Sequence, residues 1–146
     1  MNYKLSAILI SVYLAAVSGN AVEAQNAQSL SLDGKSFSGE LRVARGLFRW
    51  IRVEDSFSFE NGMIVWESGL GGGYKQVPFE TSYIDEKLMF KARFFREEGD
   101  FVDWTGVYDG ESISEVKGIW TRVEDDFVHN LLLPAKVNFL FKVEDS

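Results

Sequence analysis

The chain has 146 residues, no cysteine and a formal net charge of −7. The absence of cysteine excludes thiol nucleophiles, zinc–thiolate sites and iron–sulfur clusters. The acidic balance, with no clustered basic face to offset it, argues against binding to nucleic acid or to anionic lipid headgroups.

The first residues have the pattern of a secretory signal peptide. Lys4 gives a short basic start, the apolar stretch 5–17 follows, and Val22-Glu23-Ala24 offers the small residues of a cleavage site. A membrane-anchoring helix is the alternative interpretation, but the apolar stretch is shorter than the roughly 20 residues that such a helix needs. We therefore expect an exported protein, periplasmic or secreted. Its expected segments are a signal peptide over 1–24, a polar leader over 25–32 and a single domain over 33–146.

Apolar and polar residues then alternate with a period of two, which is typical of strands with one buried face. Two more strands are expected between Leu47 and Glu67, and no run of helical periodicity follows the signal peptide. Gly106 and Gly118 lie within predicted strands and indicate sharp bends. The clearest alternating segments are 36–43, 76–83, 88–94, 102–108, 115–121 and 136–143.

Short turns connect these segments. Asn61-Gly62 and Asp109-Gly110 each stand between apolar runs, and both residues of such a turn tolerate positive φ. Glu98-Gly99-Asp100 and Asp85-Glu86-Lys87 are further short connections. Strands joined in this way predict an antiparallel meander of about eight strands, and closing it into a small β-barrel removes the exposed edges. A two-sheet sandwich is the alternative.

No catalytic or metal-binding constellation stands out. His129 is the single histidine; with Asp125 and Asp126 it supplies fewer groups than a zinc site needs, and the sequence places no particular serine near it. Asp103 and Glu115 lie on the polar faces of neighbouring predicted strands, where solvated charges are expected. We therefore predict no enzyme activity, no cofactor and no metal. If an activity exists, substitution of His129 or Asp103 should abolish it.

A glycine-rich run and a short repeat remain. The run 69–73 lacks the Lys-Ser/Thr of a phosphate-binding loop and predicts a flexible hairpin loop, which would be the lid of an open barrel. The sequence Arg-Val-Glu-Asp begins at Arg52 and again at Arg122, and Lys142-Val-Glu-Asp-Ser146 is similar. Each copy predicts a strand that ends in an acidic turn. Calcium binding is the alternative, although the spacing of a calcium loop is absent.

Aromatic side chains occupy the apolar faces of most predicted strands. If the strands pair in order, these rings point to a common interior and either fill a solid core or line a pocket for an apolar ligand. The candidate ligand-binding residues are Phe79, Tyr83, Phe90, Phe94, Trp104, Tyr108, Trp120, Phe139 and Phe141.

The second half of the chain resembles calycin-like barrels. The resemblance is in the strand–turn–strand texture of Trp104-Thr-Gly106-Val-Tyr-Asp-Gly110, followed by Gly118-Ile-Trp120. Calycin-like proteins include lipocalin-type and fatty-acid-binding-type barrels, which commonly carry apolar small molecules. The resemblance therefore implies a barrel fold and a carrier function.

Together these features predict an exported, soluble, non-catalytic β-barrel that binds a hydrophobic small molecule or lipid. One alternative is a structural or protein-interaction domain with a filled core and a protein partner in the cell envelope. Another is a small outer-membrane barrel, which would turn its apolar face toward lipid.

Overall fold

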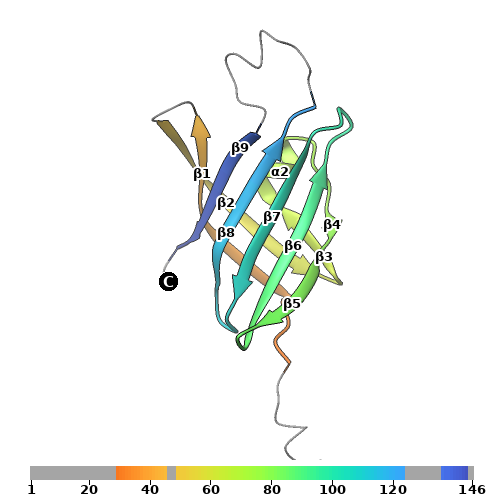
Figure 1. The fold of residues 1–146 in the computed structure, drawn as a ribbon, viewed down its shortest axis with the longest axis vertical. Coiled ribbons are helices and arrows are strands. Elements are labelled where there is room, and N and C mark those ends of the chain that lie inside the picture. Colours follow the sequence, from red (N-terminus) through yellow and green to blue (C-terminus); the bar gives the residue numbers. More distant parts are fainter. Residues whose placement is uncertain (1–28, 46–48, 124–135, 145–146) are drawn as a thin grey trace, which may run out of the picture.

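The computed structural model describes residues 29–45, 49–123 and 136–144; the predicted signal peptide lies outside these residues. Within them the chain forms nine strands and one short helix, which confirms the all-β prediction (Figure 1). The elements are β1 (Lys35–Arg45), β2 (Arg49–Glu60), β3 (Met63–Trp66), α2 (Glu67–Gly71), β4 (Val77–Pro78), β5 (Glu80–Ile84), β6 (Lys87–Phe95), β7 (Phe101–Tyr108), β8 (Ile113–Thr121) and β9 (Lys136–Val143). No helix among the described residues has the length and apolar character needed to cross a bilayer.

The strands form one antiparallel sheet that wraps into a nearly closed barrel. Its order is β4-β3-β2-β1-β9-β8-β7-β6-β5, so β9 returns to lie between β1 and β8 (Figure 1). Sequential neighbours pair almost throughout, as expected for a meander. The predicted closure into a barrel is therefore confirmed, with nine strands instead of about eight.

The additional strand arises where the predicted segment 76–83 divides at Phe79. Pro78 has no N–H to give to a ladder, and the N–H of Phe79 donates to the carbonyl of Gly62 at 3.3 Å. As a result β4 pairs with β3 and β5 pairs with β6, although a single residue separates them. The two ends of the sheet are thus joined by the chain itself.

We call the line between β4–β5 and β6 the seam. Backbone pairing across it runs from Ile84↔Lys87 to Glu80↔Lys91 and stops there. The rest of β6, Ala92–Phe95, pairs with β7 on one side, and no ladder partner is found on the other side among the described residues. The upper half of the seam is therefore held by side chains.

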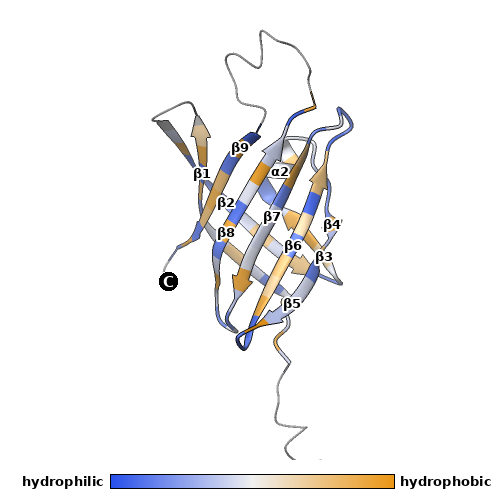
Figure 2. Ribbon diagram, in the orientation of Figure 1, coloured by the Kyte–Doolittle hydropathy of each residue, from blue (hydrophilic) through white to orange (hydrophobic). Residues whose placement is uncertain are grey.

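The apolar faces point inward, so the interior of the barrel is filled. Figure 2 shows how hydrophobic and hydrophilic residues alternate along the strands. Phe57 lies at the centre, with its ring centroid 4.9 Å from that of Trp104 and 5.0 Å from that of Phe141. Trp66 packs 5.3 Å from Trp104 in the same cluster. Each of these side chains is at most 5% exposed. The described part of the interior therefore agrees with the solid-core interpretation of the aromatic residues rather than with a pocket lined by their rings.

The two strand glycines allow close approach of rings. A Cβ on Gly106 would lie 2.5 Å from the ring of Phe90, and one on Gly118 would lie 3.0 Å from the indole of Trp104. Gly106 also stands at an irregularity, because the register passes from Thr105↔Lys117 to Val107↔Ser114 and leaves one extra residue on β8. The bulge thus lies on β8 opposite Gly106, and the close approach of Phe90 is what requires a glycine at position 106, while Gly118 makes room for Trp104.

Three local expectations differ from the structure. The run 69–73 is not a hairpin loop: α2 occupies Glu67–Gly71, too short to give a helical period in the sequence. Leu32, assigned to the polar leader, is 1% exposed and belongs to the core. The repeat at Arg52 lies within β2, so its Asp55 is not in a turn. The acidic residues of the copy at Arg122 lie outside the described residues.

Candidate functional site

A cleft of about 720 Å³ opens at the upper half of the seam. It lies where β4 and β6 are not joined by a ladder, so its position follows from the division of the strand at Phe79. Its apolar lining includes Val77 and Pro78 from β4, Ala92 and Phe95 from β6, and Trp104 from β7. Its polar lining consists of Glu80, Lys91, Arg93, Asp103 and Thr105.

Trp104 connects this cleft with the core. Its side chain is fully buried, packs against Phe57 and lines the cleft. Its indole N–H is also buried and has no hydrogen-bond partner among the described residues. A buried donor without an acceptor is unfavourable by about 1–3 kcal/mol. An acceptor brought by a ligand would remove this cost.

Two ion pairs lie beside the cleft. The guanidinium of Arg93 binds both carboxylate oxygens of Asp103, at 2.5 and 2.8 Å. The ammonium of Lys91 lies 2.9 Å from Glu80, across the last paired position of the seam. All four groups are substantially exposed, so they can exchange partners with a charged ligand at little cost.

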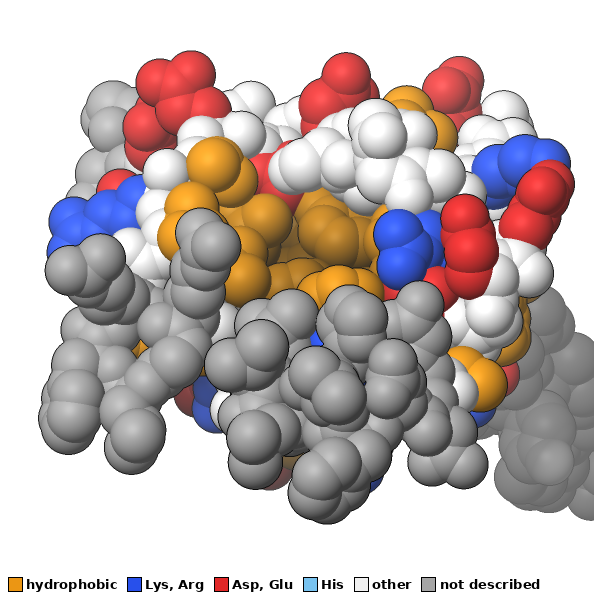
Figure 3. Space-filling view, turned by 90° about the horizontal axis from the view of Figure 1, so that it is seen from above, with side chains coloured by type: hydrophobic (Ala, Val, Ile, Leu, Met, Phe, Trp, Pro, Cys, Tyr) orange, Lys and Arg blue, Asp and Glu red, His pale blue; other side chains and the backbone are white. Residues whose placement is uncertain are grey.

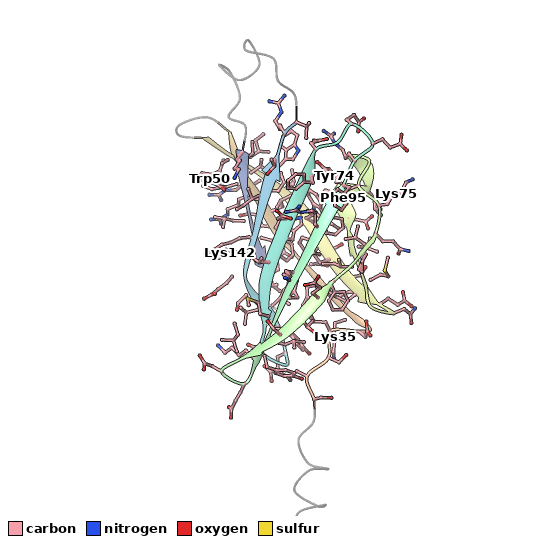
Figure 4. The ribbon with its side chains drawn as sticks, turned by 45° about the vertical axis from the view of Figure 1, so that its right-hand side comes forward. Lys35, Trp50, Tyr74, Lys75, Phe95 and Lys142 are labelled. Carbon is pink, nitrogen blue, oxygen red and sulfur yellow. The ribbon has the colours of Figure 1, made fainter. Side chains whose placement is uncertain are left out.

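Above the cleft, where backbone pairing across the seam has ended, side-chain hydrogen bonds join the two sides of the seam. The hydroxyl of Tyr74, on the segment before β4, donates to Asp100 at 3.3 Å, and Asp100 lies in the turn after β6. Arg96 donates to both oxygens of Asp100, and the indole N–H of Trp120 donates to it at 2.6 Å. Figure 4 shows Tyr74 toward the upper end of the barrel. We refer to Tyr74, Arg96, Asp100 and Trp120 as the clasp.

The clasp shifts the titration of two of its members. Burial alone would raise the pKa of Asp100, but the hydrogen bonds from Arg96 and Trp120 outweigh it and hold the pKa below its usual range. Burial and then the negative charge of Asp100 raise the pKa of Tyr74 to about 12. At neutral pH the carboxylate is therefore ionised and the phenol keeps the proton that it donates.

A smaller cavity of about 130 Å³ lies at the upper rim, beside the clasp. Arg96, Asp100, Trp120 and Arg122 contribute to its wall, and the Arg122 guanidinium stacks 5.6 Å from the ring of Trp120. Seen from this end, apolar side chains form the floor of a hollow with charged groups around it (Figure 3). Because the carboxylate of Asp100 already satisfies Arg96, this cavity offers less free binding capacity than the cleft.

A second buried carboxylate also accepts from a tryptophan. Asp55 is 7% exposed and receives the indole N–H of Trp66 at 2.6 Å. The backbone N–H groups of Ser56 and Ser68 donate to its other oxygen at 2.8 and 2.9 Å. These bonds fix the start of α2 on β2, so we assign Asp55 a structural role.

Most of the predicted ligand-binding residues lie in the core. Phe90, Phe94, Trp104, Tyr108, Phe139 and Phe141 are buried, while Phe79 and Trp120 are half-buried. Trp104 alone among them lines the cleft, and Trp120 belongs to the clasp. The structure therefore brings most of these rings together as packing.

Tyr83 differs from the expectation of an interior position. It pairs with Leu88 and so has the inward orientation, but it lies at the lower end of β5 and is 58% exposed. Its hydroxyl donates to the carbonyl of Leu30 at 3.2 Å instead of meeting the core. The alternation predicted correctly which face of β5 carries Tyr83. It could not predict that Tyr83 lies beyond the end of the barrel interior.

Several residues of the cleft and clasp were missed. Tyr74 follows the glycine run, where no periodicity marks it, and Asp100 is a turn residue that the sequence places on the surface. Val77 and Ala92 lie on predicted strands and Phe95 follows one directly, but their positions around one cleft depend on the break at Phe79. No sequence signal indicated that break except Pro78.

The carboxylates considered for catalysis are separate. Asp103 is bound by Arg93, and Glu115 is exposed at the bulge with a φ of 52°. His129, Asp125 and Asp126 lie outside the described residues. Within the described residues no three His, Cys, Asp or Glu side chains are arranged to hold a metal ion.

The fold and cleft define the protein as an antiparallel β-barrel with a filled core and a lateral cleft. No protein-family model matches the chain, and the searches of curated proteins and of solved structures gave no match either. The expected barrel is thus supported by the structure alone, and the calycin-like resemblance is supported only at the level of an antiparallel barrel.

Proposed function

We propose that the protein is an exported, non-catalytic β-barrel that binds an amphipathic small molecule or lipid in the cleft at the seam. The observation that carries this proposal is a cleft of about 720 Å³ lined in part by Trp104, whose buried indole N–H has no hydrogen-bond partner among the described residues. Pockets for small molecules typically measure about 300–1,000 Å³ and combine apolar walls with a few polar groups.

The lining suggests the chemistry of the ligand. Val77, Pro78 and Phe95 offer contact to an apolar body, and Lys91 and Arg93 offer cations to an acidic head group. The Trp104 N–H would donate to an oxygen of the ligand. An apolar chain or ring system with one anionic or carbonyl group meets all three requirements.

The orientation of the side chains favours a barrel surrounded by water over one in an outer membrane. A membrane barrel carries an apolar outer band, whereas here the rings face inward. On the outer face of β6, β7 and β8 lie charged residues, among them Lys91, Asp103 and Lys117.

A second candidate function rests on the same gap in the ladder. The unpaired edge of β6 over Ala92–Phe95 offers backbone groups to a strand of another protein, as in β-strand addition. This candidate corresponds to a barrel with a filled core that acts through a protein partner. A strand on this edge would cover the cleft, so the two functions exclude each other at this position.

The test uses a blocked cleft and a matched control. Thr105→Trp puts a large ring on the exposed cleft wall, and Ile119→Trp puts the same ring on the exposed face of β8 outside it. Titration calorimetry with anilinonaphthalene sulfonate and with dodecanoate should show binding to the wild type and Ile119→Trp, and loss of it in Thr105→Trp. Circular dichroism confirms that each variant is folded.

Two results would overturn the proposal. One is equal binding of both probes by the two tryptophan variants; the other is no binding of either probe by the wild type. A different result would support the second candidate. In that case the Ala92–Phe95 amides would exchange hydrogen slowly in the isolated protein, and this protection would be lost when a bound partner chain dissociates.

A further inference from the structure

The end of the β1–β2 hairpin projects beyond the barrel wall. Pairing of β1 with β9 stops at Val43, and pairing of β2 with β3 begins only at Phe57. The strands between pair with each other, up to Arg45↔Arg49 (Figure 1). We call residues 42–45 and 49–53 the arginine hairpin.

This hairpin exposes large apolar side chains. Trp50 is 49% exposed, Val53 40% and Ile51 39%. Trp50 pairs with Ala44 on one face, while Ile51 pairs with Val43 on the other. Figure 4 shows Trp50 at this projecting end, away from the cleft. The described part of the barrel therefore leaves apolar surface exposed on both faces of this hairpin.

The same hairpin concentrates positive charge. The register sets Arg42 opposite Arg52 and Arg45 opposite Arg49, with no acidic residue between Leu41 and Val53. Like charges directly opposite each other destabilise a strand pair. In a chain with a net charge of −7, a cluster of arginines that destabilises its own strand pair suggests that an anionic partner binds there.

Among the described residues, Glu40 and Glu54 lie on the same face as Arg42 and Arg52, and Glu40 is the one that forms an ion pair there. Glu40 accepts a hydrogen bond from Arg42 at 2.5 Å, and its pKa is lowered by that bond and further by the charges of Arg42, Arg52 and Lys142. Among the described residues, no ion pair involves Arg52. The hairpin thus retains positive charge for an anionic partner.

We propose that the arginine hairpin docks the protein onto an anionic lipid bilayer. Tryptophan favours the membrane–water interface, and arginines favour the headgroup layer of anionic lipids. The aliphatic side chains of Ile51 and Val53 gain from hydrocarbon and gain little from a polyanion such as nucleic acid. The combination therefore favours a membrane over a nucleic acid.

The acidity of the remaining chain does not prevent this contact. At physiological salt, exposed charges are screened over about 8 Å. Carboxylates on the far side of the barrel are therefore largely screened from a bilayer that touches the hairpin, and Arg42 and Arg52 act on it at short range. The expectation from net charge alone, that anionic lipid is repelled, applies to the other faces.

Vesicle co-sedimentation of the full chain tests the proposal. The vesicles are pure phosphatidylcholine or an equal mixture with phosphatidylglycerol. We expect tighter binding to the mixed vesicles, weakened by added salt. Each arginine near the surface contributes about a fivefold change in affinity, so Arg42→Gln/Arg52→Gln should weaken binding by about 25-fold. Trp50→Ser should weaken it further.

The control has the same charge change elsewhere. Lys35→Gln/Lys117→Gln removes two exposed cations from other positions and should change binding less than threefold, a bound set by the short range of the interaction. The N-terminal residues are the same in all variants, so they do not affect the comparison.

Equal binding to both kinds of vesicle would overturn the proposal, as would an equal loss in the two double variants. Binding to single-stranded DNA that competes fully with the vesicles would also overturn it. Because Thr105→Trp leaves the hairpin intact, it should keep vesicle binding. Failure of membrane docking is therefore distinguishable from failure of the cleft.

Discussion

Two regions of the barrel hold neighbouring strands together in different ways. One is the closed wall, formed by β7, β8, β9 and β1, and the other is the seam at β4–β6. In the wall, continuous antiparallel ladders join each strand to the next, and Phe57, Trp104 and Phe141 fill the space behind them. In the seam, the ladder ends at Glu80↔Lys91, and the clasp holds the rest. The barrel is continuous where rings pack, and a cleft opens where side chains replace the ladder.

Because of this difference, the candidate binding site does not coincide with the aromatic residues that the sequence analysis proposed for ligand binding. Rings packed edge to face leave no room for a guest, whereas the interrupted ladder leaves a cleft of about 720 Å³. Substitutions of the packed rings should therefore act mainly on stability, and substitutions on the cleft wall should act mainly on binding. Substitutions in the clasp should lower stability by less than the loss of a core ring.

The largest effect is expected from Phe57→Ala. This ring is 1% exposed and touches Trp104 and Phe141, so its removal should lower the free energy of unfolding by about 3–5 kcal/mol. Phe95→Ala is the partner variant in the seam: the ring is 57% exposed, and its loss should change stability by at most about 1 kcal/mol. Urea denaturation measures both. Equal losses would remove the distinction between wall and seam.

Asp100→Asn should be next. It weakens the charged hydrogen bonds from Arg96 and Trp120, at an expected cost of about 2–3 kcal/mol at neutral pH. Because the folded pKa is lowered, this stabilisation is present above the unfolded pKa of about 4 and is lost as the pH falls through the folded value. The stability difference between wild type and variant should therefore shrink in acid. Denaturation at neutral and acidic pH checks this; a constant difference would contradict it.

Gly106→Ala should cost about 1–3 kcal/mol, because its new Cβ would lie 2.5 Å from the ring of Phe90. Gly71→Ala, at the end of α2, has nothing within 4 Å of the added carbon and should leave stability unchanged or raise it slightly. Thermal unfolding compares the two variants. A neutral Gly106→Ala would show that the wall can yield around Phe90.

Tyr74→Phe should have the smallest effect, a loss of about 1 kcal/mol for one hydrogen bond across the seam. The raised pKa, about 12, means that the folded state holds the phenolic proton more tightly. Its contribution is therefore full below the unfolded pKa of about 10 and is lost as the pH rises above it. The absorbance of tyrosinate should show a late-titrating phenol in the wild type that is absent from the variant.

The sequence predicted the parts of the fold that depend on local pattern. Alternation gave the strands and their buried faces, and Asn61-Gly62 forms its turn with φ values of 53° and 75°. At Asp109 the side chain accepts the N–H groups of Glu111 and Ser112, both at 2.9 Å. These features need only neighbouring residues, so a single sequence can indicate them.

The site could not be predicted in the same way. Asp55 and Asp100 are polar residues whose burial depends on tryptophans distant in the chain. The meeting of Val77 with Ala92 depends on where one ladder stops. The net charge gave no indication of the arginine hairpin, because a sum over the whole chain does not show that the strand register pairs arginine with arginine.

The junction at Phe79 has a consequence for how a guest would enter. A barrel sealed all round by ladders must break several backbone hydrogen bonds before anything passes between its strands. Among the described residues, one direct hydrogen bond, from Tyr74 to Asp100, crosses the upper half of the seam, and below it a single residue, Phe79, separates β4 from β5. Sideways admission would therefore leave the packed rings undisturbed, so uptake and release need not compete with the stability of the fold.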